Sequence, residues 1–179
     1  MPRIALTLVD PRTPAVAALI AELDFYQTNL YPPASNHLLP ISALLAPNIH
    51  VVGATVDGTL AGCGAIVDER EYAEIKRMFV AERFRRFGVG RRILAELEAI
   101  ARQAGISVAR LESGIHQLEA LGLYERAGYA RRAEFGSYAP DPLSVFMEKA
   151  IASHAAGSAA SSPSGTGTLI NRARKSPSS

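Results

Sequence analysis

Short apolar segments alternate with segments of helical spacing along the first 149 residues. The short apolar segments predict strands at 4–9, 49–56, 59–67, 72–80, 107–112, 129–132 and 144–149. Apolar positions three and four residues apart predict helices at 13–29, 88–103 and 117–127, with a short additional helix at 41–45. Asp57-Gly58 predicts a tight hairpin between the second and third strands, because both residues tolerate a positive φ.

Local residue types add three expectations to this pattern. Two consecutive prolines, Pro32 and Pro33, exclude regular structure at 31–37. Glu98 and Arg102 are spaced to pair on the exposed side of helix 88–103. Cys63 lies in a strand of small and apolar residues, which favours a core position over a nucleophile.

The order of the predicted elements is typical of a mixed α/β domain. Three successive strands predict an antiparallel meander, and the helix at 88–103 predicts a crossover to a later strand. We therefore expect one domain over residues 1–149. The segment 150–179 is rich in Ala, Ser and Gly, carries basic but no acidic residues, and is expected to be a disordered tail.

Charge and composition narrow the function classes. The net charge of +2 combines 15 basic and 17 acidic residues up to Glu148 with four basic residues after it. The folded part is thus slightly acidic, which argues against a nucleic-acid partner. The sequence contains neither an apolar segment long enough to span a membrane nor a signal peptide, so a cytoplasmic protein without a membrane partner is expected. With one cysteine and no metal-ligand spacing of histidines, no metal is expected.

A local basic segment carries the strongest functional signal. Seven Lys and Arg residues and one acid, Glu82, lie between positions 76 and 92. Within it, Arg85-Arg86-Phe87-Gly88-Val89-Gly90 joins a strand to the start of a helix. Backbone N–H groups and the helix dipole converge at such a turn, and glycines let a ligand approach the main chain. The segment therefore predicts a site for a phosphate or pyrophosphate.

Three blocks of this sequence resemble one enzyme family. Residues 74–90, with the Arg85-x-x-Gly88-x-Gly90 pattern, resemble the acetyl-CoA-binding core of the GNAT N-acetyltransferases, and 111–129 resemble its second block, with Leu-Tyr followed by Gly-Tyr. Residues 135–149 resemble a bacterial branch that acts on small molecules. The resemblance implies a mixed, mostly antiparallel central sheet with a splayed central parallel pair, flanked by helices.

The resemblance also implies acetyl-CoA as co-substrate and a direct transfer in a ternary complex to the primary amine of a small molecule. The implied acetyl-CoA-binding residues are Met78, Phe79, Val80, Arg85, Arg86, Phe87, Gly88, Val89, Gly90 and Arg91. In this family the strand before the turn carries a bulge, whose N–H can stabilise the thioester oxygen. Arg86, where relatives often have glycine, and the apolar Phe87 depart from the family pattern.

Catalytic roles follow from the same resemblance. Tyr124 matches the family tyrosine that protonates the departing thiolate, and a phenol suits this task because its pKa is close to that of a thiol. Glu74, eleven residues before Arg85, matches the catalytic glutamate of one branch. Glu112 on the neighbouring strand is a second candidate base, and a water relay is a third.

The acceptor site is expected between the first helix, its following loop and the last hairpin. The implied acceptor-binding residues are Tyr31, Ser35, His37, Gln117 and Tyr138. A protein acetyltransferase and a non-catalytic acyl-CoA-binding module are the alternative functions. A homodimer is compatible with the family pattern, in which many members pair through sheet or helix edges.

Overall fold

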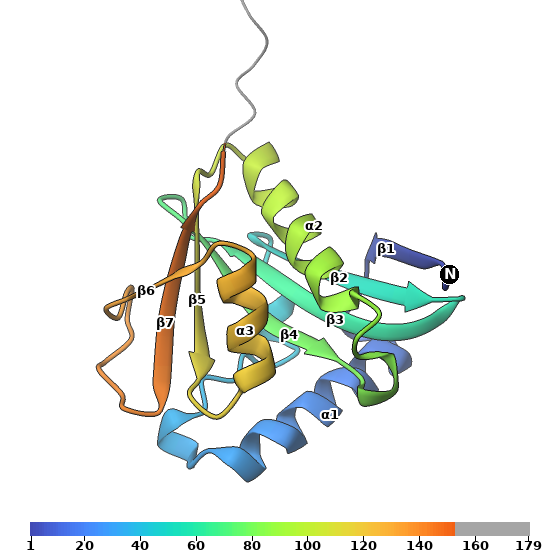
Figure 1. Ribbon diagram of the computed structural model, residues 1–179, viewed down its shortest axis with the longest axis horizontal. Coiled ribbons are helices and arrows are strands. Elements are labelled where there is room, and N and C mark those ends of the chain that lie inside the picture. Colours follow the sequence, from blue (N-terminus) through green and yellow to red (C-terminus); the bar gives the residue numbers. More distant parts are fainter. Residues whose placement is uncertain (153–179) are drawn as a thin grey trace, which may run out of the picture.

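The computed structural model describes residues 1–152, which form a seven-stranded sheet with helices on both faces (Figure 1). The strands are β1 (Ile4–Leu8), β2 (Ile49–Val56), β3 (Thr59–Asp68), β4 (Ala73–Val80), β5 (Val108–Gly114), β6 (Ala130–Arg132) and β7 (Ser144–Ala150). The helices are α1 (Pro14–Leu30), α2 (Val89–Gln103) and α3 (Leu118–Arg126). Short 3-10 turns occupy Pro33–Ser35, Ala43–Leu45 and Glu82–Phe84.

The sheet has the order β1-β2-β3-β4-β5-β7-β6. Strands β4 and β5 are parallel, and the other neighbouring pairs are antiparallel. This is the mixed sheet with a central parallel pair that the sequence predicted. The parallel pair arises because α2 connects the end of β4 back to the start of β5, as a crossover connection requires.

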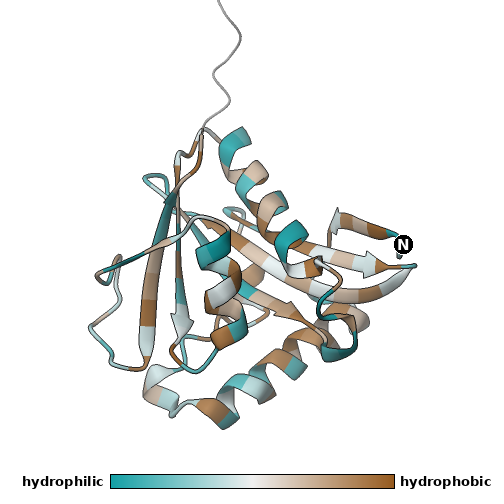
Figure 2. Ribbon diagram, in the orientation of Figure 1, coloured by the Kyte–Doolittle hydropathy of each residue, from teal (hydrophilic) through white to brown (hydrophobic). Residues whose placement is uncertain are grey.

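Two apolar cores hold the helices against the sheet. On one face, α2 and α3 cover a core that includes Ile93 and Leu97, both without solvent exposure. On the other face, α1 packs through Ile20 and Leu23 on the inner residues of β2, β3 and β4. Polar residues of α2 face outward while the central strands are largely apolar (Figure 2). The helical spacing of apolar residues therefore sets which side of each helix is buried.

Three local expectations need correction. The predicted helix at 41–45 is only the 3-10 turn Ala43–Leu45, because Pro47 favours an extended conformation at Ala46, which ends the turn. Pro33–Ser35 forms a 3-10 turn within the segment expected to be irregular, with Asn36 N–H donating to the carbonyl of Pro33.

Glu98 pairs with Arg102 at 3.5 Å as expected, but it is buried rather than exposed. Its carboxylate accepts hydrogen bonds from Tyr129 at 3.0 Å and from Lys149 at 2.9 Å. These two partners come from the segment between α3 and β6 and from β7, so only the folded arrangement could reveal the burial.

The folded part extends slightly beyond residue 149. Strand β7 ends at Ala150, and Ile151 is buried with its N–H donating to the carbonyl of Ser107 at 2.8 Å. The predicted disordered tail lies, from residue 153 on, outside the described residues. Within residues 1–152, no helix combines the length and apolar character needed to cross a membrane.

Candidate active site

Strands β4 and β5 separate after a short paired segment. Residues 73–75 of β4 pair with 109–111 of β5, although β4 continues to Val80 and β5 to Gly114. The predicted splayed pair is therefore present, and the unpaired ends of both strands leave an opening in the middle of the sheet.

A β-bulge in β4 begins the separation. Phe79 lies opposite Cys63 and Lys76 lies opposite Ala65, so two residues of β4, Arg77 and Met78, face one residue of β3. The extra residue increases the local twist and turns β4 away from β5. The bulge lies at 77–78, directly before the segment 79–80 that also lines the opening.

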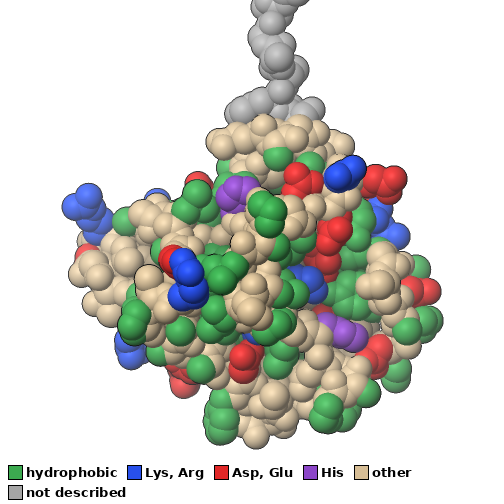
Figure 3. All heavy atoms as spheres, turned by 180° about the vertical axis from the view of Figure 1, so that it is seen from behind, with side chains coloured by type: hydrophobic (Ala, Val, Ile, Leu, Met, Phe, Trp, Pro, Cys, Tyr) green, Lys and Arg blue, Asp and Glu red, His purple; other side chains and the backbone are tan. Residues whose placement is uncertain are grey.

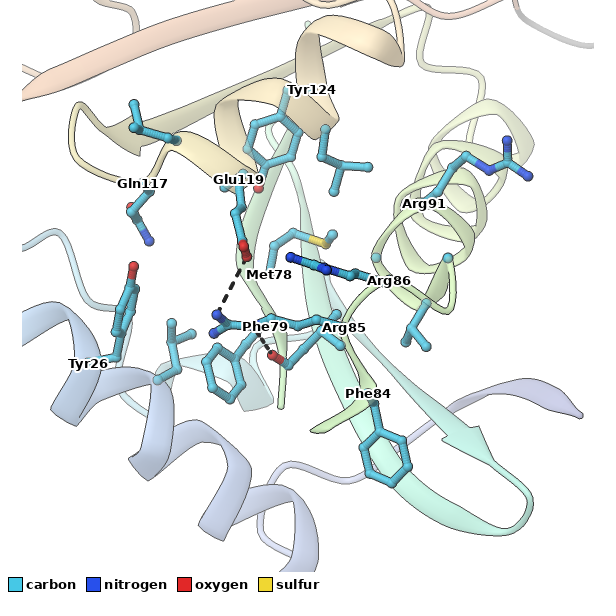
Figure 4. A pocket seen from close by; sticks show the side chains of 18 of the residues that line it. Tyr26, Met78, Phe79, Phe84, Arg85, Arg86, Arg91, Gln117, Glu119 and Tyr124 are labelled. Atoms are coloured by element: carbon cyan, nitrogen blue, oxygen red, sulfur yellow. Dashed lines mark hydrogen bonds and ion pairs between the residues drawn. The ribbon is translucent and has the colours of Figure 1, made fainter. Parts of the chain in front are cut away.

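A cleft of about 850 Å³ lies at this opening, between β4, α1, α2 and α3 (Figure 4). Its lining includes nine of the ten residues predicted to bind acetyl-CoA: Met78, Phe79, Val80, Arg85, Arg86, Gly88, Val89, Gly90 and Arg91. The tenth, Phe87, is not among the lining residues, and its side chain is 50% exposed. Phe87 lies on the exposed side of the turn, and its contact with the cofactor stays a prediction.

The α2 end of the cleft fits a phosphate group. Gly88 is the N-terminal cap of α2 and has a φ of +80°, a conformation that favours glycine. A Cβ on Gly90 would lie 3.2 Å from the Leu123 side chain across the cleft. Four arginines line the same cleft: Arg85, Arg86, Arg91 and Arg126. The helix N-terminus, the close approach to the main chain and the positive charge together suit the pyrophosphate of coenzyme A.

Arg85 lies across the cleft. Its Nε donates to the carbonyl of Val80 at 3.2 Å, and its Nη1 lies 3.5 Å from Glu119 on α3 (Figure 4). The Val80 carbonyl therefore faces the opening, and so does the Val80 N–H, because both main-chain groups of a strand residue point to the same side. This edge of β4 can pair with an extended ligand chain.

Sequence reasoning missed several lining residues. Arg126, Glu119 and His116 come from α3 and the segment before it, and Leu23 and Tyr26 come from α1. Arg126 could have been predicted, because it is a basic residue within the second block, residues 111–129, that resembles the family. The α1 residues gave no signal, since their approach to β4 depends on how α1 packs against the sheet.

Tyr124 lies at the wall of the cleft formed by α3, with its ring directed into the cleft (Figure 4). It is 5% exposed and packs edge to face on Tyr129. Burial raises the pKa of the Tyr124 phenol, and the nearby carboxylate of Glu112 raises it further. Tyr124 thus keeps its proton at neutral pH, but the raised pKa makes it a weaker acid than the unperturbed phenol whose pKa lies close to that of a thiol.

A second group of candidate functional side chains lies on the α1 face of the sheet. This polar cluster consists of Glu74, Lys76, Glu112, Ser144, Tyr138 and His37. Acidic, basic and histidine side chains surround a hollow on this face (Figure 3). The cluster comes from β4, β5, β7, the loop after α1 and the loop before β7, segments far apart in the sequence.

Glu74 is fully engaged within the polar cluster. Its carboxylate accepts a hydrogen bond of 2.5 Å from the Tyr138 hydroxyl and pairs with Lys76 at 2.9 Å. Lys76 also donates to the Tyr138 oxygen at 2.5 Å. Glu74 is 5% exposed and is not among the residues that line the cleft. Its carboxylate is thus part of a closed ion-pair network.

Glu112 has a different environment. Its carboxylate accepts a hydrogen bond of 2.6 Å from Ser144, and burial is the main cause of its raised pKa. The hydrogen bond from Ser144 and the charges of His37 and Lys76 oppose this increase. Glu112 is also close enough to Tyr124 to affect its pKa. Glu112, like Glu74, does not line the cleft, but of the two it is the one whose charge affects Tyr124 at the cleft wall.

The other predicted acceptor residues divide between the two regions. Gln117 lines the cleft and accepts a hydrogen bond from the Gly114 N–H at 3.0 Å. Tyr31 is buried, and its hydroxyl accepts a hydrogen bond from the His116 N–H at 3.0 Å. His37 contacts the Tyr138 ring edge to face in the polar cluster. Ser35 lies near Asp141, whose pKa its hydrogen bond lowers.

The sequence predicted a core position for Cys63 and no bound metal. Cys63 is 1% exposed, and burial raises the pKa of its thiol to about 12, as suits the core residue that was predicted. Among residues 1–152, no three His, Cys, Asp or Glu side chains are grouped so that they could hold a metal ion.

Comparison with known proteins identifies the family. Residues 16–129 match the model of the Acetyltransferase (GNAT) family. The chain is 46% identical over 153 residues to a protein of Azospirillum brasilense named IAA acetyltransferase, covering 84% of this chain and 100% of that protein. A crystal structure of a candidate acyl-CoA N-acyltransferase from Klebsiella pneumoniae has 39% identity and a TM-score of 0.70, covering 83% of this chain and 97% of the other.

A more distant structure carries the ligand that the cleft fits. The PaiA N-acetyltransferase of Thermoplasma acidophilum, solved in complex with coenzyme A, has a TM-score of 0.64 at 17% identity and covers 83% of this chain and 99% of that chain. At this identity the likeness concerns the fold. The splayed strands, the cleft and these matches lead to one conclusion: the chain belongs to the GNAT family of acetyltransferases.

Proposed function

We propose that this acetyltransferase transfers the acetyl group of acetyl-CoA to the primary amine of a small molecule, with both substrates bound at once. The observation that carries the proposal is the pair Tyr124 and Glu112. Tyr124 lines the cleft on the α3 side, Glu112 belongs to the polar cluster on the α1 face, and the charge of Glu112 contributes to the raised pKa of the Tyr124 phenol. A donor cleft and an acceptor region that meet in this way suit direct transfer.

The charge of the polar cluster favours an amine acceptor. Two carboxylates, Glu74 and Glu112, face one lysine, Lys76, and the Ser144 hydroxyl contributes a neutral donor. When both carboxylates are ionised the cluster is net negative, which attracts a protonated amine. The name of the relative from A. brasilense, IAA acetyltransferase, supports a small-molecule acceptor.

The co-substrate is held by residues already described. The N-terminus of α2 and the cleft arginines bind the pyrophosphate, and the exposed edge of β4 at Val80 pairs with the pantetheine chain. Bound there, acetyl-CoA supplies an acetyl group activated as a thioester. A backbone N–H of the bulged segment, residues 77–79, donates a hydrogen bond to the carbonyl oxygen on which negative charge develops.

Glu112 and Tyr124 move the protons in this proposal. Glu112 accepts a proton from the ammonium group, so that the amine nitrogen can form a bond to the carbonyl carbon. Its raised pKa makes it a better base than an ordinary carboxylate. Tyr124 gives its proton to the sulfur as the carbon–sulfur bond breaks, and the second proton, lost by the nitrogen after its attack, restores the Tyr124 phenol. The products are an N-acetylated amine and coenzyme A with a free thiol, and one proton is released overall.

The test is release of free thiol from acetyl-CoA by the purified protein, with a panel of amino acids, polyamines, aminoglycosides, aryl amines and IAA. Thiol release that depends on one amine, with an N-acetylated product of the expected mass, supports the proposal. Acetylation of proteins or peptides, but of no small amine, overturns the substrate class. Thiol release with IAA but with no amine also overturns it.

Glu112→Gln tests the base. We expect turnover to fall about 1000-fold with the affinity for coenzyme A unchanged, because glutamine keeps the size and an acceptor for Ser144 but takes up no proton. Glu74→Gln is the matched control, since it changes the same chemical group on β4. If Glu74→Gln loses more turnover than Glu112→Gln, the assignment of the base is reversed.

A further inference from the structure

Arg77 has a backbone conformation that is rare for its residue type. It lies in the middle of β4 with a φ of +57°, in the left-handed region that favours glycine. Its side chain is only 4% exposed, although it carries a permanent positive charge. A strained backbone and a buried charge at one position require compensating contacts.

Those contacts are made by two segments outside the sheet. The Arg77 guanidinium pairs with Asp24 on α1, and its Nε donates to the carbonyl of Leu39 at 2.8 Å. Leu39 belongs to the loop after α1 that also carries His37 of the polar cluster. The side chain of Arg77 therefore connects the β4 bulge both to α1 and to the acceptor loop.

The main chain at Arg77 is fixed from the opposite side. The Cys63 thiol on β3 lies 3.6 Å from the Arg77 carbonyl and donates to it. Gly64 lies opposite the bulge, and a Cβ there would come within 2.7 Å of the Met78 sulfur. With β3 on one side and the guanidinium contacts on the other, the bulge has little freedom to change its conformation.

We propose that Arg77 is a positioning residue for acetyl transfer. It holds the bulge of β4 in the conformation that aims a backbone N–H at the thioester carbonyl, and it holds the acceptor loop at a fixed distance from that group. The proposal rests on the oxyanion role given to the bulge in the proposed function. Arg77 itself does not face the cleft, so it acts through the main chain of its neighbours.

Binding measurements with Arg77→Met give a test that needs no acceptor. If the bulge N–H contacts the thioester carbonyl, the wild type binds acetyl-CoA more tightly than coenzyme A. Arg77→Met should keep the affinity for coenzyme A within about threefold and lose the preference for acetyl-CoA. Equal affinity of the wild type for both ligands, or a preference that survives in Arg77→Met, overturns the proposal.

Turnover with an identified amine gives the second readout. We expect Arg77→Met to lower kcat about 30-fold with a much smaller change in KM for acetyl-CoA, because a misplaced donor affects the reacting centre most. Arg102→Met is the matched control: it removes an arginine paired with a buried carboxylate, Glu98, on α2. Its kcat should stay within about twofold of wild type. If Arg77→Met folds and its kcat is unchanged, Arg77 has only a structural role and the proposal is wrong.

Two further variants cover the case in which Arg77→Met fails to fold. Asp24→Asn leaves Arg77 in place and weakens one contact of a side chain that is 38% exposed, so the fold is expected to persist. It should lower kcat about fivefold and reduce the preference for acetyl-CoA. Arg77→Lys should restore part of the kcat lost in Arg77→Met.

An Asp24→Asn enzyme with wild-type kcat and ligand preference contradicts the proposal. Absence of amine-dependent turnover in the wild type would instead overturn the proposed function, and the binding test would still stand.

Discussion

The acetyl-CoA cleft and the polar cluster are built in different ways. Most of the cleft comes from one continuous stretch, residues 78–91, together with α3. The features of the cleft that suit a phosphate are backbone groups at a helix N-terminus and glycine positions, together with arginine side chains. The polar cluster takes single side chains from five separate segments, and each depends on its partners. The cleft is therefore encoded locally, whereas the cluster exists only in the folded chain.

This difference has a functional consequence. A site made of backbone groups binds one ligand type and tolerates many side-chain changes around it. A site made of side chains can change its specificity through a few substitutions without affecting the fold. The two regions should accordingly respond differently to mutation: cleft variants should alter coenzyme A binding, and cluster variants should alter the response to the amine.

The largest effect is expected for Gly88→Glu in the cleft. A carboxylate at the start of α2, at a position with φ of +80°, introduces backbone strain and repels the pyrophosphate. Binding of coenzyme A measured by calorimetry should weaken by at least about 1000-fold. Gly105→Glu is the control, because Gly105 has a φ of +81° at the opposite end of α2. Retained micromolar affinity in Gly88→Glu would disprove the phosphate site.

A smaller effect is expected for Tyr124→Phe, which lies where the two regions meet. Loss of the phenol proton should lower kcat about 100-fold with little change in the affinity for coenzyme A. Thiol release and ligand binding are measured on the same preparation. Tyr129→Phe, which changes the neighbouring ring, is the control for packing. Turnover within about twofold of wild type would remove Tyr124 from the proton-donor role.

His37→Ala should affect the cluster alone. Loss of the edge contact with Tyr138 should weaken binding of the amine by about 1 kcal/mol, which is equivalent to a fivefold rise in KM for the amine. KM for acetyl-CoA should stay constant, because His37 does not line the cleft. Equal changes in both KM values would mean that the two regions are not separable.

The smallest effect concerns stability and pH. Burial raises the pKa of Glu112 above its usual 4.5, so the folded state prefers the protonated carboxyl. This preference contributes fully below the unfolded pKa and is lost as the pH rises through the folded pKa. Glu112→Gln, which cannot ionise, should therefore melt at a higher temperature than wild type near neutral pH. The difference should vanish below about pH 4. A lower melting temperature at neutral pH would contradict the assigned cause.

The contrast between the cleft and the polar cluster also explains which predictions from the sequence were accurate. The family resemblance implied the bulge and the splayed pair, and the structure contains both. The predicted phosphate turn follows from a short contiguous pattern, and most of its residues line the cleft. The exposed position of Phe87 could not be predicted, because the orientation of one side chain in a turn depends on the backbone path. The sequence left Glu74 and Glu112 open as bases. Their environments differ because Tyr138 and Lys76 engage Glu74, and Tyr138 is 64 residues away along the chain.

The sequence alone predicted the order of the main strands and helices, the hairpin at Asp57-Gly58 and the glycine-containing turn before α2, because these depend on local periodicity, φ preferences and helix-end electrostatics. The tertiary structure decided the burial of Glu98, the link between Glu112 and Tyr124, and the anchoring of the β4 bulge by Asp24 and Leu39. The physical reason is that these features depend on contacts between residues far apart in the sequence. Desolvation and ion pairing depend on which side chains are brought within a few ångströms, and packing of the helices on the sheet sets those distances.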